Sequence, residues 1–195
     1  MITPDVTPER VVEIAAGAVR GGADVVQLRH KSLPRGELLT LARRLREGIP
    51  SVLLMVNDHV DIALLSGADG VHLGPDDLSI EAARHVAGDR LLIGASASTV
   101  ERALQAVEEG ADYLGSGPAF ATPIKARKQV IGPRGVAAIA QAVDIPVFAI
   151  GGIDESNVGQ LALAGIRRAA VIRAVSESTD PEQAARRLRA MLTVR

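Results

Sequence analysis

Residues Gly67-Ala68-Asp69-Gly70-Val71-His72-Leu73 carry the clearest signal of the architecture, because they join the end of one structural unit to the start of another. Gly67 follows an amphipathic segment, and a glycine after a helix readily adopts the left-handed conformation that ends it. The apolar run from Gly70 to Leu73 is typical of a short strand that is buried on both faces. The stretch therefore predicts a helix, a tight turn and a parallel strand.

The same junction recurs along the chain, at Gly21-Gly22-Ala23-Asp24, Gly110-Ala111-Asp112 and Gly165. Apolar runs predict strands at 25–29, 52–57, 70–73, 91–96, 113–117, 147–151 and 169–174. Amphipathic segments predict helices at 8–20, 35–47, 58–65, 80–86, 100–109, 135–142, 157–164 and 181–192. We expect an eighth strand, far shorter than usual, at 1–3. Eight strand–helix units predict a single (β/α)8 TIM-barrel domain over residues 1–195 with a very short first strand. An open, doubly wound sheet is the alternative, since the pattern does not report closure.

The composition excludes several classes of protein. Of the 195 residues, 47% are hydrophobic and only 2% aromatic, so the chain is globular with an aliphatic core. Lys and Arg (22) nearly balance Asp and Glu (23), which argues against a nucleic-acid partner. No apolar run is long enough to span a membrane. Zero cysteines fit a reducing compartment, and the cytoplasm is expected. The expected partners are small-molecule substrates, and association into a homo-oligomer stays open.

Two carboxylates follow neighbouring strands, where a barrel places its reactive groups. Asp58 comes directly after the run 52–57, and Asp77 follows the run 70–73. The pair could hold a hard cation such as Mg²⁺, with phosphate oxygens and water completing the ligands. The alternative is that each aspartate caps the helix that follows it.

Cations and glycines at the same expected rim suit a polyanionic substrate. Arg29, Lys31 and Lys125 lie at strand ends or in the long loop after residue 117, and as an alternative they are ordinary surface charges. The pair Gly151-Gly152 follows an apolar run and suggests a phosphate cradle, or otherwise a tight turn. Arg173 could add a cation beside that phosphate, or pair with an acidic neighbour outside the barrel.

Six motifs occur in a fixed order: Gln27-Leu28-Arg29-His30-Lys31; Val56-Asn57-Asp58; Ala68-Asp69-Gly70-Val71-His72-Leu73-Gly74 with Asp77; Gly94-Ala95-Ser96; Asp112-Tyr113-Leu114-Gly115-Ser116-Gly117-Pro118 with Phe120, Thr122 and Lys125; and Ala149-Ile150-Gly151-Gly152-Ile153. In this order and spacing they resemble the thiamin phosphate synthase family, also called thiamin phosphate pyrophosphorylase. The resemblance spans nearly the whole chain.

The resemblance implies a (β/α)8 transferase with Mg²⁺ as cofactor. Such an enzyme joins hydroxymethylpyrimidine pyrophosphate, whose ring carries an amino group, to a thiazole phosphate and releases pyrophosphate. The resemblance would assign Asp58 and Asp77 to the metal. It would place Arg29, Lys31, Asn57 and Lys125 on the pyrophosphate, Gln27 and Ser96 on the pyrimidine or pyrophosphate, and Thr122, Gly151, Gly152, Ile172 and Arg173 on the thiazole phosphate. Arg29, Lys31, Ser96 and Lys125 would be the catalytic groups.

The chain departs from the family pattern at a few positions. His30 stands where an acidic residue is usual, Ser98 where histidine is common, and Ile124 where a hydroxyl residue is frequent. These departures motivate one rival function, a barrel that binds a thiazole or thiamin phosphate without turnover. The other rival is a thiazole tautomerase, which the run Arg134-Gly135-Val136 resembles and which Ser98 argues against. Retention of Asp58 and Asp77 favours the synthase, because the tautomerase handles no pyrophosphate.

Overall fold

Seven parallel strands form one sheet in the computed structural model, which describes residues 1–122 and 129–193. The strands pair in chain order, each with the next. They are β1 (Val25–Leu28), β2 (Leu53–Asn57), β3 (Gly70–Leu73), β4 (Leu92–Ala97), β5 (Tyr113–Ser116), β6 (Val147–Ile150) and β7 (Ala169–Ala170). Because every strand runs the same way, all their carboxyl ends lie along one rim of the sheet.

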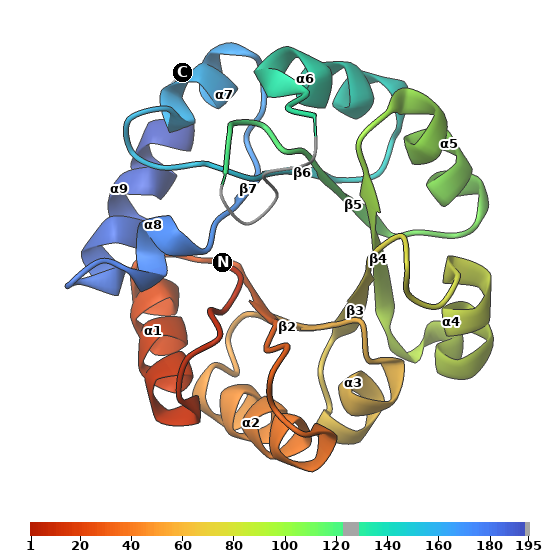
Figure 1. Cartoon of the computed structure of the whole chain (residues 1–195), viewed down its shortest axis with the longest axis vertical. Helices are drawn as coiled ribbons and strands as arrows, with labels where there is room; N and C mark the ends of the chain where they lie inside the picture. Colours follow the sequence, from red (N-terminus) through yellow and green to blue (C-terminus); the bar gives the residue numbers. More distant parts are fainter. Residues whose placement is uncertain (123–128, 194–195) are drawn as a thin grey trace.

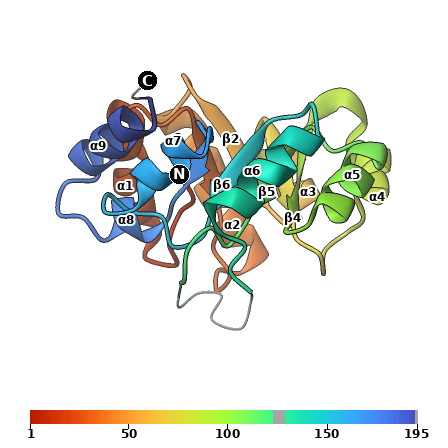
Figure 2. The ribbon, with the colours of Figure 1, turned by 90° about the horizontal axis from the view of Figure 1, so that it is seen from above.

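Helices surround the curved sheet on its outer side (Figure 1). They are α1 (Pro8–Arg20), α2 (Arg35–Gly48), α3 (Val60–Ser66), α4 (Ile80–Ala87), the short 3-10 helix η1 (Gly88–Arg90), α5 (Val100–Glu108), α6 (Gly132–Ala142), α7 (Val158–Leu163), α8 (Arg173–Ser176) and α9 (Pro181–Thr193). Helices α1, α8 and α9 gather on one side and α4 and α5 on the opposite side (Figure 2). None of these helices in the described part of the chain is long and apolar enough to cross a membrane.

The predicted alternation of strands and helices is confirmed, and the core explains it. All four residues of β3 are buried, as expected for a strand covered on both faces. Gly67 ends α3 with φ +68°, so the expected left-handed helix end is present. The core is aliphatic, with large buried side chains such as Ile14, Leu41 and Leu114.

The eight-stranded closed barrel is corrected to a TIM-barrel-like sheet of seven strands. Residues 1–3, expected as the first strand, form only an isolated parallel bridge, between Ile2 and Gln27. The Ile2 N–H donates to the Val171 carbonyl on the side of β7 at 2.9 Å, and the Thr3 N–H donates to the Gln27 carbonyl at 2.9 Å. This segment lies between the first and last strands without forming a regular strand.

The last strand is shorter than expected. The apolar pattern predicts a strand over 169–174, but β7 ends at Ala170 after two residues that pair with β6. The backbone turns at Ile172 (φ −113°, ψ −81°), and the four-residue helix α8 begins at Arg173. Arg173 therefore lies at the start of a helix on the rim, where the sequence predicts the end of a strand.

Candidate active site

Asp58 begins the loop after β2 in a conformation that is unusual for a side-chain-bearing residue. It is the one non-glycine residue with positive φ in the described part of the chain, at +65°. Its N–H donates to the His72 carbonyl at the end of the neighbouring strand β3, at 2.9 Å. The following helix α3 has His59 at its N-cap and receives no side-chain cap. The alternative role of Asp58 as a helix cap is therefore wrong.

Asp77 is also not a helix cap. Its carboxylate turns back and accepts the Gly74 N–H at 2.8 Å, which holds the loop after β3 in a tight turn. Helix α4 is capped instead by Ser79, whose hydroxyl accepts the Ala82 N–H at 3.1 Å. Both aspartates are thus fixed on the rim by backbone contacts of the strand ends.

The two carboxyl groups lie within hydrogen-bond reach of each other. Burial, followed by the hydrogen bond and negative charge of Asp77, raises the pKa of Asp58 from 3.8 to about 6, while Lys31 and Arg29 act in the opposite direction. Two carboxylates that approach this closely need a shared proton or a cation between them. A pair of carboxylates suits Mg²⁺, which prefers oxygen ligands and keeps several waters. The described residues contain no cluster of three or more His, Cys, Asp or Glu side chains that could hold a metal.

The loop after β1 brings two cations toward this pair, and Asp5 organises it. Arg29 Nη1 lies 3.6 Å from the Asp5 carboxylate, and Asp5 accepts the Lys31 N–H at 2.8 Å. The Thr3 hydroxyl bonds to both the N–H and the carbonyl of Arg29. His30 lies 2.8 Å from the Val6 carbonyl through Nε2. The sequence analysis missed Asp5, although its place just after the expected first strand was a usable signal.

A second group of expected residues lines one cavity of about 210 Å³ between the ends of β6 and β7. The expected residues in its wall are Thr122, Gly151, Gly152, Ile172 and Arg173. Gly152 has φ +66°, and a Cβ there would lie 2.5 Å from the Ala121 carbonyl oxygen, so only glycine fits. Arg173 is exposed and forms no ion pair with another described residue, so the alternative of an acidic neighbour outside the barrel is not found there.

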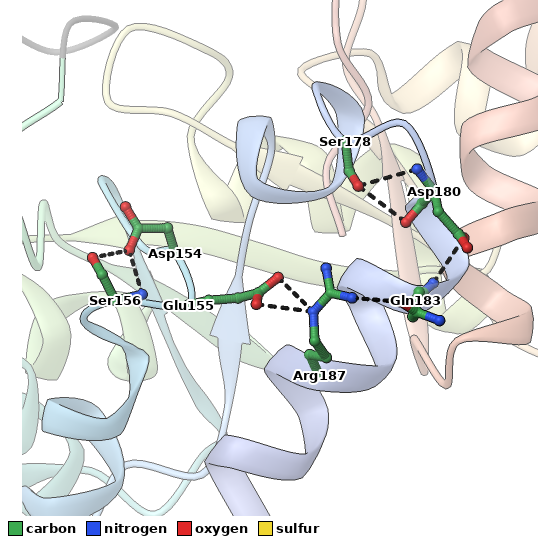
Figure 3. A network of polar contacts seen from close by, with 7 residues as sticks. All are labelled: Asp154, Glu155, Ser156, Ser178, Asp180, Gln183 and Arg187. Carbon is green, nitrogen blue, oxygen red and sulfur yellow. Dashed lines mark hydrogen bonds and ion pairs between the residues drawn. The ribbon is translucent and has the colours of Figure 1, made fainter.

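The loop that follows the glycine pair is held by contacts with itself and with α9 (Figure 3). Asp154 accepts the Ser156 N–H at 2.9 Å. Arg187 of α9 donates to the Glu155 carboxylate at 2.9 Å and to the Gln183 side chain at 2.8 Å. The last long helix of the chain therefore fixes the loop at the 210 Å³ cavity.

The remaining expected residues lie inside the sheet or at its rim. Gln27 and Ser96 come from β1 and β4, and His72 Nε2 lies 3.1 Å from the Ser96 hydroxyl. His72 is buried, as its place within a strand predicts. Asn57 ends β2 directly before Asp58. Lys125, together with Ile124, lies outside the described residues. The rim therefore brings together the aspartates and the loop that carries Arg29 and Lys31, and a separate cavity holds the glycine pair.

Comparison with known proteins places the chain in a family. The profile of a family described as "Thiamine monophosphate synthase" matches residues 1–175. The chain belongs to the thiamine monophosphate synthase family. Among its relatives, the thiamine-phosphate synthase of Anaeromyxobacter dehalogenans is 47% identical over 180 residues, which cover 90% of this chain and 80% of the relative. The thiamine-phosphate synthase of Gloeobacter violaceus is 46% identical over 173 residues, and the chain spans about half (51%) of that longer relative.

A solved member of the thiamine monophosphate synthase family has the same architecture. The thiamine phosphate pyrophosphorylase from Pyrococcus furiosus superposes with a TM-score of 0.89 at 41% identity, which covers 98% of this chain and 93% of that one. The resemblance in the sequence motifs is therefore confirmed at the level of the family and of the fold.

Proposed function

We propose that this chain is a thiamin phosphate synthase, a transferase that couples hydroxymethylpyrimidine pyrophosphate to a thiazole phosphate and releases pyrophosphate. The carboxyl pair of Asp58 and Asp77 beside Arg29 and Lys31 carries the proposal. A pair of acids alone repels a polyanion, and a pair of cations alone does not recruit a metal. Together they suit a pyrophosphate that arrives with a divalent ion. The expected setting is the cytoplasm.

Asp58 and Asp77 would hold Mg²⁺; burial and then the neighbouring Asp77 raise the pKa of Asp58, and a cation bound between the two carboxylates would favour their charged forms. The bound metal would neutralise charge on the pyrophosphate oxygens. The left-handed backbone at Asp58 also supports a functional role, since strained residues persist where the surrounding structure holds them for a purpose.

Arg29 and Lys31 would bind the pyrophosphate and stabilise the charge that develops as its bond to the pyrimidine methylene breaks. Asp5 holds the backbone of their loop at Lys31 and lies beside the Arg29 guanidinium, so the loop is ordered before the bond breaks. Lys125 is assigned to the same anion by the family resemblance alone. The thiazole nitrogen then attacks the pyrimidine methylene carbon, so the reaction needs no strong general base, and none of the proposed roles is that of a base.

The second phosphate would occupy the cavity at Gly151, Gly152 and Thr122. The positive φ values of the two glycines (+97° and +66°) allow close approach of a ligand to the backbone. The exposed guanidinium of Arg173 would add a charge-assisted contact from the cavity wall. This arrangement would hold the thiazole in line with the departing pyrophosphate.

The test is formation of thiamin phosphate from the two substrates, with and without Mg²⁺. We expect product only with a divalent ion. We expect Asp77→Asn to raise the Mg²⁺ concentration needed for half-maximal rate without lowering the melting temperature. The matched control is Asp89→Asn, which changes an exposed aspartate in η1. Absence of product under every metal condition would overturn the proposal, and full activity without divalent ions would remove the roles of Asp58 and Asp77.

A further inference from the structure

Thr3 is fully buried and holds both backbone polar groups of Arg29. The Arg29 N–H donates to the Thr3 hydroxyl oxygen at 2.9 Å, and the hydroxyl donates its own hydrogen to the Arg29 carbonyl at 3.0 Å. The directions follow from the groups themselves, because an N–H only donates and a carbonyl only accepts. One side chain therefore fixes the backbone of a residue that is assigned to the pyrophosphate.

The Thr3 hydroxyl takes the place of a continued strand. The start of the chain pairs with β1 as in a parallel ladder: the Gln27 N–H donates to the Met1 carbonyl and the Thr3 N–H donates to the Gln27 carbonyl, both at 2.9 Å. The next step of such a ladder would join Arg29 to the Thr3 carbonyl and to the Asp5 N–H. The backbone bends at Asp5 instead, and the Thr3 hydroxyl bonds to both groups of Arg29 in their place.

The bend places the two residues after Pro4 against the rest of the loop that follows β1. The Asp5 carboxylate accepts the Lys31 N–H at 2.8 Å, and the Val6 carbonyl lies 2.8 Å from His30 Nε2. Each residue of 29–31 is therefore held by the segment 3–6. Within this segment, Thr3 is the buried anchor and Asp5 and Val6 are exposed.

We propose that Thr3 is a positioning residue for the proposed reaction: it fixes the backbone at Arg29 and thereby directs the guanidinium to the pyrophosphate. Arg29 has a long side chain, so a change in its backbone dihedral angles displaces the guanidinium further than the backbone itself. A cation that is held in place before the anion arrives loses less conformational freedom on binding. The proposal rests on the proposed function, because it takes pyrophosphate as the anion at Arg29.

The first test needs no ligand. Amide hydrogen exchange followed by NMR reports whether the Arg29 N–H is held by a hydrogen bond. Thr3→Val keeps the shape of the side chain and removes the hydroxyl, whereas Thr3→Ser keeps the hydroxyl. We expect slow exchange in the wild type and in Thr3→Ser, and exchange about tenfold faster in Thr3→Val. Fast exchange of this amide in the wild type, or equal exchange in Thr3→Val, would overturn the proposal.

The second test measures binding of inorganic pyrophosphate by titration calorimetry in the presence of Mg²⁺. We expect Thr3→Val to weaken binding about tenfold, the equivalent of about one charge-assisted hydrogen bond, and Thr3→Ser to bind as the wild type does. In an Arg29→Ala background, Thr3→Val should cause no further loss, because Thr3 acts through Arg29. Equal losses in both backgrounds would show that Thr3 supports only the packing of the fold.

The matched control is Ser66→Ala, which also deletes a buried hydroxyl that donates to a backbone carbonyl, that of Ala63 at 3.2 Å. Ser66 ends α3, before the amino end of β3 and away from the rim. We expect this variant to bind pyrophosphate as the wild type does, and weaker binding would assign the effect to lost stability and count against the proposal. If Thr3→Val does not fold, Thr3→Ala, which removes the same hydroxyl without the branched side chain, takes its place in both tests.

The binding and activity measurements separate this proposal from the proposed function. Pyrophosphate binding by a wild type that forms no thiamin phosphate would overturn the proposed function, and the calorimetry would still decide the role of Thr3. Formation of thiamin phosphate, with equal pyrophosphate affinity in the wild type and Thr3→Val, would overturn the role of Thr3 alone. A wild type that binds no pyrophosphate would overturn both.

Discussion

Replacing Asp58 by asparagine removes a negative charge that lowers the stability of the folded, metal-free protein at pH 7.5. The folded pKa of about 6 lies above the ordinary value of 3.8. This difference corresponds to at most about 3 kcal/mol, and because Asp58 is only half-buried, solvent screening reduces the expected effect to about 1 kcal/mol. Asparagine also tolerates the left-handed backbone at this position. For a chain of this length, we expect Asp58→Asn to melt about 2–4 °C higher at pH 7.5 without metal.

The sign of the pH dependence follows from the same shift. A raised folded pKa means that the folded state binds the proton more tightly than the unfolded state, so the contribution of Asp58 to wild-type stability becomes more favourable as the pH falls from about 7 toward 4. The advantage of Asp58→Asn should therefore shrink at pH 5, and Mg²⁺ should stabilise only the wild type. Thermal unfolding followed by circular dichroism, in chelator and in Mg²⁺ at both pH values, measures this. A variant that melts lower than the wild type at pH 7.5, or by the same difference at pH 5, would refute the electrostatic reasoning.

Three further changes test the second cavity. Gly152→Ala forces a Cβ to within 2.5 Å of a backbone oxygen, so we expect at least about 2 kcal/mol lower stability in denaturant unfolding, whereas Gly159→Ala, in open space in α7, should stabilise slightly. Arg173→Ser should raise the KM for thiazole phosphate about tenfold with kcat unchanged; an unchanged KM would place the guanidinium away from the phosphate. Glu155→Gln breaks an exposed ion pair and should cost under about 1 kcal/mol, yet raise the KM for thiazole phosphate severalfold. Glu182→Gln, which breaks the ion pairs of α9 residue Glu182 with Arg20 and Arg186, should leave that KM unchanged.

The sequence predicts the strands and helices well because each unit repeats the same local signals. Helix α1 and strand β3 begin and end where the pattern places them. The ends of β7 and α8 were not predictable, because Val171 and Ile172 continue an apolar run while the strand stops for lack of regular partners. Residues 1–3 form their bridge with Gln27 of β1, and beside β7 the Ile2 N–H donates to the Val171 carbonyl. How many backbone groups pair at this edge is a property of the whole sheet.

The candidate site was predictable where it depends on strand ends. Asp58 and Asp77 come together because β2 and β3 are neighbours, which follows from the order of the units. The contacts of Tyr113 were not predictable, because its hydroxyl reaches His72 only where Gly94 leaves space for its ring. Such an arrangement depends on three strands at once, and no local pattern in any one of them reports it.

The packing of Tyr113 over Gly94 also limits how this enzyme can be redesigned. Any side chain introduced at Gly94 collides with the tyrosine ring, so a library that varies Gly94 alone would sample almost only damaged proteins. A larger residue at position 94 on β4 would be tolerated only together with a smaller residue at position 113 on β5, so both positions have to change in the same variant.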